Sequence, residues 1–353
     1  MGVESPGVGL LGYAFMGRAH AHALITLAHM TGPPAIAPRL VSVAGRDEAQ
    51  RTEFAERFGF ARHVADWQEV VADPEVEVVE NLLPNHLHAE PVIAAARAGK
   101  HVLCEKPLAL DAAEAREMLA AVTEAGVVHM CAFNYRFVPA VRRAREILEA
   151  GELGEVHHFR GTYRQSWGAD PAREGVWRFD AAQAGGGALG DLASHVIDMS
   201  RYLVGEIDSV AAQVATFVPG RTVDDAAAAA VSFEGGAIGT IEATRFATGE
   251  LNRFTWEING SKGSLGFDLE RPAELIVNGK RALVNPDGWW PPGHVLGWEH
   301  TFVFELRRFL DAVGGRCEVA PHGATFADGL RAAEVGDAIV LSAREGRRIT
   351  PGA

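Results

Sequence analysis

Cysteine is scarce in this chain of 353 residues. Its three cysteines, Cys104, Cys131 and Cys317, lie far apart, and no two of them form a CxxC pair. Such spacing argues against a disulfide framework and against a cysteine-based zinc site, and it is typical of proteins in a reducing compartment.

Long apolar runs are also lacking. No stretch reaches the roughly 20 apolar residues with which a helix spans a bilayer. Residues 1–12 carry no basic flank and no small-residue cleavage pattern, so they do not resemble a secretory signal. We therefore expect a cytoplasmic protein without a membrane partner.

Positive charge is in deficit, because 33 Lys and Arg residues oppose 46 Asp and Glu residues, for a formal net charge of −13. The arginines are scattered, which argues against a positive field for phosphate backbones, and we expect no nucleic-acid partner. We expect no metal either. The pairs His20/His22 and His86/His88 are two residues apart, a spacing that does not bring two side chains to one metal ion.

The sequence does contain apolar residues for two cores, since 48% of the chain is hydrophobic and its length exceeds that of one ordinary domain. In the first part, short apolar runs alternate with helical patterns, which predicts a doubly wound parallel sheet. The predicted strands are 7–11, 40–44, 76–83, 101–104 and 127–132, and the predicted helices are 16–30, 48–58, 111–124 and one ending near Ala98.

Single residues predict two helix starts in this part. Asp66 and Glu69 form a capping-box pattern, so a short helix should begin there. Pro91 is tolerated only within a first helical turn, so the helix ending near Ala98 should begin late or be kinked, with Gly99 as its cap.

After about Tyr135 the pattern changes. One predicted helix, 139–150, is followed by strand-like stretches, and turn sequences such as Asn278-Gly279 favour an antiparallel sheet. The predicted strands are 155–163, 210–217, 226–233, 237–244, 253–259, 264–268 and 274–277, and the closing helices are 298–312 and 325–344.

These patterns predict an α/β protein of two domains. Residues 1–133 should form the domain with the doubly wound parallel sheet. Residues 134–353 should form an α+β domain on a large, mostly antiparallel open sheet, with C-terminal helices able to pack back on the first domain.

A dinucleotide fingerprint, GYAFMG at residues 12–17, lies between the first predicted strand and the first helix. Such a turn lets backbone N–H groups and a helix N-terminus meet a pyrophosphate. The bare pattern often occurs by chance, but its place in a βαβ alternation predicts a Rossmann domain. The predicted contacts are Gly12, Ala14, Phe15 and Met16.

The end of the second strand bears on the choice between NAD and NADP. A carboxylate there accepts both ribose hydroxyls of NAD, but the sequence has Gly45 followed by Arg46. Arg46 is suited to a 2′-phosphate or to stacking on adenine, which favours NADP without excluding NAD. Alternatively, Arg46 is a solvated surface residue and Asp47 caps the next helix.

Lys106 follows a predicted strand of the first domain and should project from the carboxyl edge of the sheet, where ligands bind in doubly wound folds. An ammonium group there can bind a substrate hydroxyl and stabilise alkoxide character. By residue type alone, a solvated surface lysine is the more frequent case.

Asp191 and His195 are four residues apart at the start of a predicted helix, 192–202, so they share one face. Imidazole suits general-base work on an alcohol, and the carboxylate can orient it or complete a proton relay. The alternative is a capping aspartate and a packed core histidine.

The chain resembles the glucose–fructose oxidoreductase and inositol dehydrogenase (Gfo/Idh/MocA) family over nearly its whole length. The matching motifs are VGLLG at 8–12, LPNHLH at 83–88, EKP at 105–107 and GDLASH at 190–195. Within the family, the stretches 132–136, 161–167 and 195–205 are most similar to the levoglucosan dehydrogenase-like branch.

The resemblance implies a Rossmann domain followed by a domain with a large open sheet. It places the family's catalytic lysine, aspartate and histidine on Lys106, Asp191 and His195. Three departures from the family are Ala14 for the middle glycine, Gly45 for an acidic residue and Leu83 for threonine. The further implied cofactor contacts are Leu83, Pro84, Asn85, His88, Glu105 and Lys106.

Six of the seven tryptophans, including Trp289 and Trp290, lie in the second predicted domain. Because a pyranose stacks its C–H faces on aromatic rings, we expect a sugar pocket there. Core packing is the alternative for any one of these residues, and it is our prediction for Trp256. The predicted substrate residues are Tyr163, Arg164, Gln165, Trp167, Trp177 and Arg178.

The leading hypothesis is an NAD(P)-dependent oxidation of a secondary hydroxyl on a sugar, anhydrosugar, glycoside or cyclitol. The first alternative, by resemblance, is a glycosidase that uses transient oxidation. The second is a non-catalytic regulator that binds dinucleotide and sugar. A homodimer or homotetramer is expected by family analogy only.

Overall fold

The computed structural model describes residues 5–29, 36–173, 175–284, 294 and 297–353. The chain divides into two compact units, each made of segments that are distant in the sequence. The first unit comprises Met1–Ala109, Ala113–Phe137 and Pro286–Gly329, and the second comprises Leu110–Ala112, Val138–Asn285 and Leu330–Ala353.

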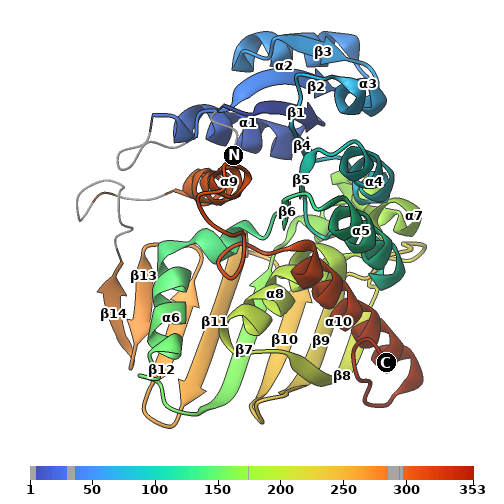
Figure 1. Cartoon of the computed structure of the whole chain (residues 1–353). Coiled ribbons are helices and arrows are strands. Elements are labelled where there is room, and N and C mark those ends of the chain that lie inside the picture. The colour runs from blue at the N-terminus through green and yellow to red at the C-terminus, as the bar shows by residue number, and fades with distance from the viewer. Residues whose placement is uncertain (1–4, 30–35, 174, 285–293, 295–296) are drawn as a thin grey trace. The chain divides into compact units, whose positions relative to one another are not determined.

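The first unit is built on a six-stranded parallel sheet of order β3-β2-β1-β4-β5-β6 (Figure 1). The strand order reverses between β1 and β4, which is the point where doubly wound sheets bind ligands. The predicted doubly wound sheet is therefore confirmed. Its strands are β1 (Gly7–Leu11), β2 (Arg39–Ala44), β3 (Arg62–Val64), β4 (Val78–Asn81), β5 (His101–Cys104) and β6 (His129–Cys131).

The helix starts predicted from Asp66 and Pro91 are confirmed. Asp66 and Glu69 form a capping box in which the Asp66 N–H donates to Glu69 Oε1 at 3.4 Å. Pro91 lies in the first turn of its helix, which begins at Ala89 after a separate 3₁₀ turn. The helices between the strands are α1 (Phe15–Leu27), α2 (Glu48–Phe58), α3 (Trp67–Ala72), α4 (Ala89–Arg97) and α5 (Ala112–Ala125).

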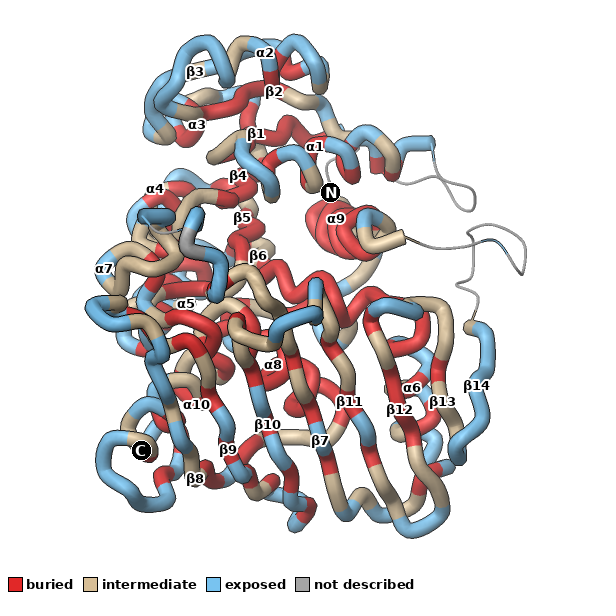
Figure 2. Tube along the Cα trace, turned by 180° about the vertical axis from the view of Figure 1, so that it is seen from behind, coloured by how far each residue is buried: buried red, intermediate tan, exposed pale blue. Residues whose placement is uncertain are grey.

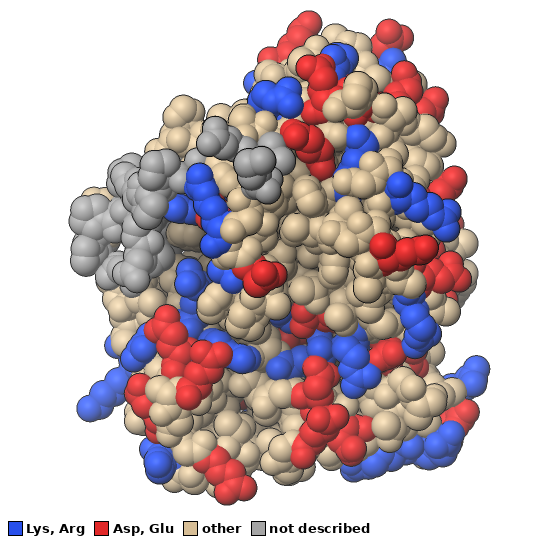
Figure 3. Space-filling view, in the orientation of Figure 1, with Lys and Arg blue, Asp and Glu red and all other residues tan. Residues whose placement is uncertain are grey.

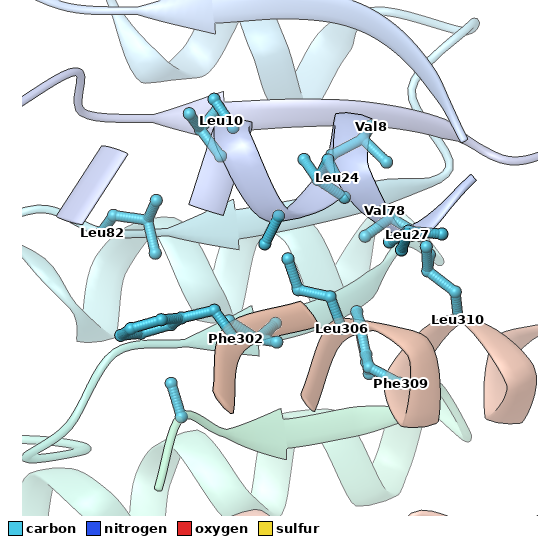
Figure 4. Close-up of a cluster of buried hydrophobic side chains, with 14 of the residues drawn as sticks. Val8, Leu10, Leu24, Leu27, Val78, Leu82, Phe302, Leu306, Phe309 and Leu310 are labelled. Carbon is cyan, nitrogen blue, oxygen red and sulfur yellow. The ribbon is translucent and has the colours of Figure 1, made fainter. Parts of the chain in front are cut away.

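A helix from late in the chain, α9 (Glu299–Val313), completes the core of the first unit. It packs on α1, and its Phe302, Leu306 and Phe309 contact the cluster that holds Leu24 and Leu27 (Figure 4). Burial of these side chains from both helices removes apolar surface from water. The core of the first unit thus depends on residues far from its sheet in sequence.

The second unit is built on an eight-stranded sheet of order β14-β13-β12-β11-β7-β10-β9-β8. Among the described strands of this sheet, β10 and β7 pair in parallel and the other pairs are antiparallel, so the prediction of a mostly antiparallel sheet is confirmed. The strands are β7 (Val156–Arg164), β8 (Ile207–Ala215), β9 (Ala226–Phe233), β10 (Ile238–Thr244), β11 (Arg253–Gly260), β12 (Ser264–Asp268), β13 (Glu274–Val277) and β14 (Lys280–Leu283).

Helices cover one face of this sheet. Buried and exposed residues alternate along β9 and β10 (Figure 2), as expected for strands with one covered face. The covering helices α6 (Pro139–Glu149) and α8 (Ser194–Leu203) pack on the strands, and α10 (Phe326–Glu345) reaches β8, where Ser342 Oγ accepts the Ala212 N–H.

The segment before α8 differs from the prediction of a single helix over 192–202. Residues Leu189–Ala193 form a π-helical turn, and α8 follows it at Ser194. All ten residues of α8 are buried. Asp191 is therefore carried by the wider turn and His195 by the first turn of the α-helix.

None of the described helices combines the length and the apolar character that a membrane crossing requires. On the face that Figure 3 shows, acidic and basic side chains are interspersed.

Candidate cofactor and substrate sites

The turn between β1 and α1 depends on two glycines. Gly12 has a φ of +101°, and a Cβ atom at Gly17 would lie only 2.4 Å from the Gly12 carbonyl oxygen. Ala14, in place of the middle glycine, has a φ of −72°, which any residue adopts. Ala14 is also the N-cap of α1, which has no side-chain cap and no acidic residue in its first turn. The helix therefore presents its N–H groups at a place suited to an anion.

A tyrosine ring covers the position where an acidic residue is expected of an NAD-preferring member. A Cβ atom at Gly45 would lie 1.8 Å from a ring carbon of Tyr13, and the Tyr13 hydroxyl accepts the Asp47 N–H at 3.1 Å. Asp47 Oδ1 in turn accepts the Gln50 N–H at 2.9 Å and caps α2, while Arg46 is exposed. These positions agree with the alternative interpretation of Arg46 and Asp47.

His88 ties together the loops that follow β4 and β5. Its buried ring has Nε2 at 2.9 Å from the Leu83 carbonyl oxygen and Nδ1 at 3.1 Å from the Pro107 carbonyl oxygen. Burial lowers the pKa of His88. Asn81 fixes the same loop, because its Oδ1 accepts the Leu83 N–H at 3.2 Å. The predicted contacts from Leu83 to His88 thus share one hydrogen-bonded loop.

Lys106 is half-buried directly after β5, and a buried carboxylate holds its backbone. Glu105 Oε2 accepts the Lys106 N–H at 3.0 Å, and Glu105 Oε1 lies 3.3 Å from Nε2 of the buried His20. The other ring nitrogen of His20 lies 3.0 Å from Glu80 Oε2. Burial alone would lower the pKa of His20, but the hydrogen bonds and charges of Glu105 and Glu80 raise it to about 10.

We expect this raised pKa to make stability depend on pH. The imidazolium contribution is fully present below the ordinary pKa of 6.5 and is lost as the pH rises through the folded-state pKa of about 10. At its steepest, the free energy of unfolding should fall by about 1.4 kcal/mol per pH unit within that window. Urea unfolding of the wild type from about pH 8 to 10 measures this fall. A free energy of unfolding that stays constant over that range would contradict the assignment.

In the second unit, Asp191 is paired with an arginine. Its Oδ2 accepts a hydrogen bond from Arg245 Nη2 at 3.0 Å, and the Arg245 side chain is only 1% exposed. The guanidinium carbon of Arg245 also lies 4.6 Å from the ring centre of Trp167, which suits a cation–π contact. Asp191 is thereby linked to one of the predicted substrate residues.

The loop before Asp191 is fixed by a second carboxylate. Asp224 accepts hydrogen bonds from the N–H groups of Gly187 at 2.6 Å and Leu189 at 2.7 Å. A Cβ atom at Gly187 would lie 1.7 Å from the Asp224 carbonyl oxygen. The glycine-rich sequence ahead of Asp191 therefore meets a steric requirement of this loop.

Tyr163, Gln165 and Trp167 lie in one hydrogen-bonded row. The Tyr163 hydroxyl and Gln165 Nε2 both donate to Asn252 Oδ1, at 2.7 and 2.6 Å, and Trp167 Nε1 donates to Gln165 Oε1 at 2.5 Å. The ring centres of Tyr163 and His195 are 5.8 Å apart. The row therefore runs from His195 towards Trp167, whose ring lies against Arg245.

Strand pairing explains why these residues meet. Arg164, at the end of β7, pairs with Thr244 at the end of β10 and with Arg253 at the start of β11. Gln165 and Arg245 directly follow β7 and β10, and Asn252 directly precedes β11. The three residues therefore lie at the same end of these paired strands. Arg245 and Asn252 were not predicted from the sequence. The sequence signal for Arg245 is limited to its position as a charged residue directly after an apolar strand.

The remaining aromatic predictions have different outcomes. The Arg178 guanidinium carbon lies 4.5 Å from the ring centre of Trp177, and the Arg178 carbonyl accepts a hydrogen bond from Arg245 at 3.3 Å. Trp256 is buried and stacks on Phe267, which confirms core packing there. Trp289 and Trp290 lie outside the described residues.

The described histidines, cysteines and acidic residues form no group of three or more that would hold a metal ion.

Two family models match the chain. The model described as an oxidoreductase family with an NAD-binding Rossmann fold matches residues 7–133, and the model of the GFO/IDH/MocA C-terminal domain matches residues 141–266. Among curated proteins, levoglucosan dehydrogenase of Pseudarthrobacter phenanthrenivorans is 40% identical over 97% of each chain. Inositol 2-dehydrogenase of Rhizobium meliloti is 31% identical over 97% of this chain and 98% of the relative.

Solved structures of levoglucosan dehydrogenase are similar over the whole length. The complex with NADH and levoglucosan superposes with a TM-score of 0.95 at 40% identity, covering 99% of this chain and 100% of that one. The complex with NADH and L-sorbose gives the same TM-score and identity and covers 99% of both chains.

Proposed function

Because the chain belongs to the Gfo/Idh/MocA family of oxidoreductases, we propose that it oxidises a secondary alcohol carbon of a sugar, anhydrosugar, glycoside or cyclitol with a nicotinamide cofactor. The observation that carries this proposal is the cluster in which Asp191 and His195 lie with Tyr163 and Trp167. Such a cluster offers a carboxylate and an imidazole beside aromatic faces, which is the combination that a polyhydroxylated ring needs.

The first unit has features that fit a dinucleotide. The tight turn at Gly12 and Gly17 and the uncapped N-terminus of α1 suit a pyrophosphate, and Phe15 beside them is 59% exposed. When bound, the nicotinamide supplies the carbon that accepts or returns the hydride. The residues that we propose to hold the cofactor are Gly12, Ala14, Phe15, Met16, Gly45, Arg46, Leu83, Pro84, Asn85, His88, Glu105 and Lys106.

Each proposed catalytic residue has a separate task. Lys106 donates a hydrogen bond from Nζ to the substrate hydroxyl oxygen and stabilises the negative charge that develops there. His195 takes the hydroxyl proton on a ring nitrogen. Asp191, held by Arg245, orients the reacting group. Tyr163, Gln165, Trp167, Trp177 and Arg178 are the proposed substrate contacts.

We expect NAD⁺ to be the better cofactor. The solved structures of levoglucosan dehydrogenase with NADH support this choice. They do not support the preference for NADP that was predicted from Arg46. Arg46 is exposed, and Gly45 lies under Tyr13. The ratio of kcat/KM for NAD⁺ to that for NADP⁺ should exceed about 10, a difference of about 1.4 kcal/mol. Initial rates at 340 nm with both cofactors measure this ratio. A ratio below one would show that NADP⁺ is the better cofactor.

A substrate panel tests the proposed activity. Levoglucosan, inositols, free pyranoses and glycosides are offered with each cofactor, and absorbance at 340 nm is followed. At least one compound should be oxidised with one reduced cofactor formed per molecule. Release of sugar from a glycoside without net absorbance change would instead indicate the glycosidase, and binding without any turnover would indicate a regulator. A cytoplasmic location and a homo-oligomer complete the proposal.

A further inference from the structure

The first unit buries a cluster of three ionisable side chains, Glu80, His20 and Glu105. His20 lies between the two carboxylates, 3.0 Å from Glu80 Oε2 and 3.3 Å from Glu105 Oε1. The three residues come from β4, α1 and the end of β5, and each is at most 5% exposed. Buried charges are costly to desolvate, so such a cluster in the core of an α/β domain calls for a specific role.

The charges in this cluster do not cancel. His20 is an imidazolium at neutral pH, so one positive charge faces two carboxylates and the cluster carries a net charge of −1. Within the described part of the chain, Glu80 Oε1 is buried without a hydrogen-bond partner. Apolar residues of similar size would serve packing at lower cost, because replacing buried ion pairs in this way is often neutral or stabilising.

Several other groups surround the cluster. From α9, the Phe302 ring lies 5.3 Å from the His20 ring, and the same helix carries the buried Glu305. The charge of Glu105 also acts on the pKa values of His88 and Cys104. Among the described residues, the groups that raise the pKa of His20 are the two carboxylates of the cluster, Glu105 and Glu80.

The cluster is joined directly to the backbone of Lys106. Glu105 uses one carboxylate oxygen for His20 and the other for the Lys106 N–H, at 3.0 Å. On the other side of Lys106, His88 contacts the carbonyl oxygens of Pro107 and Leu108 at 3.1 and 3.2 Å. Lys106 thus sits between two anchored neighbours.

We propose that His20 is a positioning residue for the reaction, because its bridge between Glu80 and Glu105 fixes the carboxylate that holds the Lys106 backbone. This inference rests on the proposed function, in which Lys106 binds the substrate oxygen. Small displacements of a catalytic group have large effects on rate, since a misplacement of about 1 Å can cost 100-fold. His20 acts through Glu105 and touches no substrate.

The test compares His20→Gln with His22→Gln in the full-length protein. His22 lies on the same helix but is exposed, so it is a matched control. We expect His20→Gln to lower kcat about 10- to 100-fold with NADH affinity within about twofold, and His22→Gln to leave both unchanged. The defect should deepen as the pH rises, because His20→Gln leaves two buried carboxyl groups without the cation between them, and they repel each other when both are charged. A kcat equal to that of His22→Gln at every pH would overturn the proposal.

A double variant separates positioning from stability. His20→Gln/Glu80→Gln returns the cluster charge to −1, and one amide can again donate to Glu105. We expect kcat to recover to within about threefold of the wild type, with loss of the new pH dependence. A folded double variant whose kcat stays tenfold low would refute the mechanism, and this holds even where His20→Gln alone does not fold.

A readout without turnover separates this inference from the proposed function. The chain has four lysines, Lys100, Lys106, Lys262 and Lys280, so ¹⁵N-lysine labelling gives four backbone amide signals. The Lys106 signal should move in His20→Gln and return in the double variant, while those of Lys262 and Lys280 stay. A static Lys106 signal would overturn the inference, whereas a wild type that oxidises nothing in the panel would overturn only the proposed function.

Discussion

Lys106→Met should lower kcat about 1,000-fold on any substrate that the wild type oxidises, while NADH affinity stays nearly unchanged. The methionine keeps an unbranched chain as far as Cε but removes the ammonium group that we propose to stabilise developing alkoxide charge. Loss of one such donor costs about 10²- to 10³-fold in related chemistry, and the lysine also orients the substrate. Steady-state kinetics give kcat, and quenching of tryptophan fluorescence gives NADH affinity.

Lys262→Met is the matched control for this experiment. Lys262 is exposed in a loop of the second unit and has no proposed role in the reaction. Its kcat should equal that of the wild type. Full activity of Lys106→Met on a confirmed substrate would remove Lys106 from the mechanism, and a loss of NADH binding would assign it to the cofactor instead.

Arg245→Met should lower kcat/KM about 100-fold and the free energy of unfolding by about 3 kcal/mol. The substitution leaves the carboxylate of Asp191, whose side chain is 23% exposed, without its buried cation. Removing one partner of a buried pair costs about 3–5 kcal/mol, and partial exposure of Asp191 places the expected value at the lower end. Trp167 also loses the guanidinium that lies 4.6 Å from its ring centre.

Two companion variants make this prediction specific. Arg245→Lys keeps the positive charge but loses the planar guanidinium that contacts both Asp191 and the Trp167 ring. Its activity should therefore fall between those of Arg245→Met and the wild type. Arg160→Met removes an exposed arginine from the same sheet, which pairs with Glu257 at 3.6 Å, and should cost less than about 1 kcal/mol. Wild-type kcat/KM in Arg245→Met would show that Asp191 works without its partner.

Much of the fold could be predicted from local sequence patterns. The bounds of β1, α2 and β5 coincide with the predicted 7–11, 48–58 and 101–104, because a glycine or a charged residue follows each element directly. The strands β3 and β14 were not predicted. They are short, and none of their residues is fully buried, so their conformation comes from pairing with a neighbouring strand and not from their own pattern.

The candidate site divides in the same way. Lys106 could be proposed because it follows a strand in a known motif, and Asp191 and His195 because their spacing is local. Arg245 and Asn252 could not, since pairing of β7 with β10 and β11 brings them to Gln165 across many residues of sequence. Likewise, Glu105 lies in the EKP motif, but nothing in the sequence links it to His20 and Glu80, and only the sheet order places the three together.

The division of the chain has a consequence for its biosynthesis. The core of the first unit needs α9, which ends at Val313. In the second unit, Val210 of β8 forms an antiparallel bridge with Ile349, which comes late in the sequence. A ribosome therefore releases the sheet strands of both units before either unit has all of its partners. Folding of the first unit can finish only after Val313 has emerged, and folding of the second only after Ile349 has emerged. A product that stops before Val313 leaves both units incomplete.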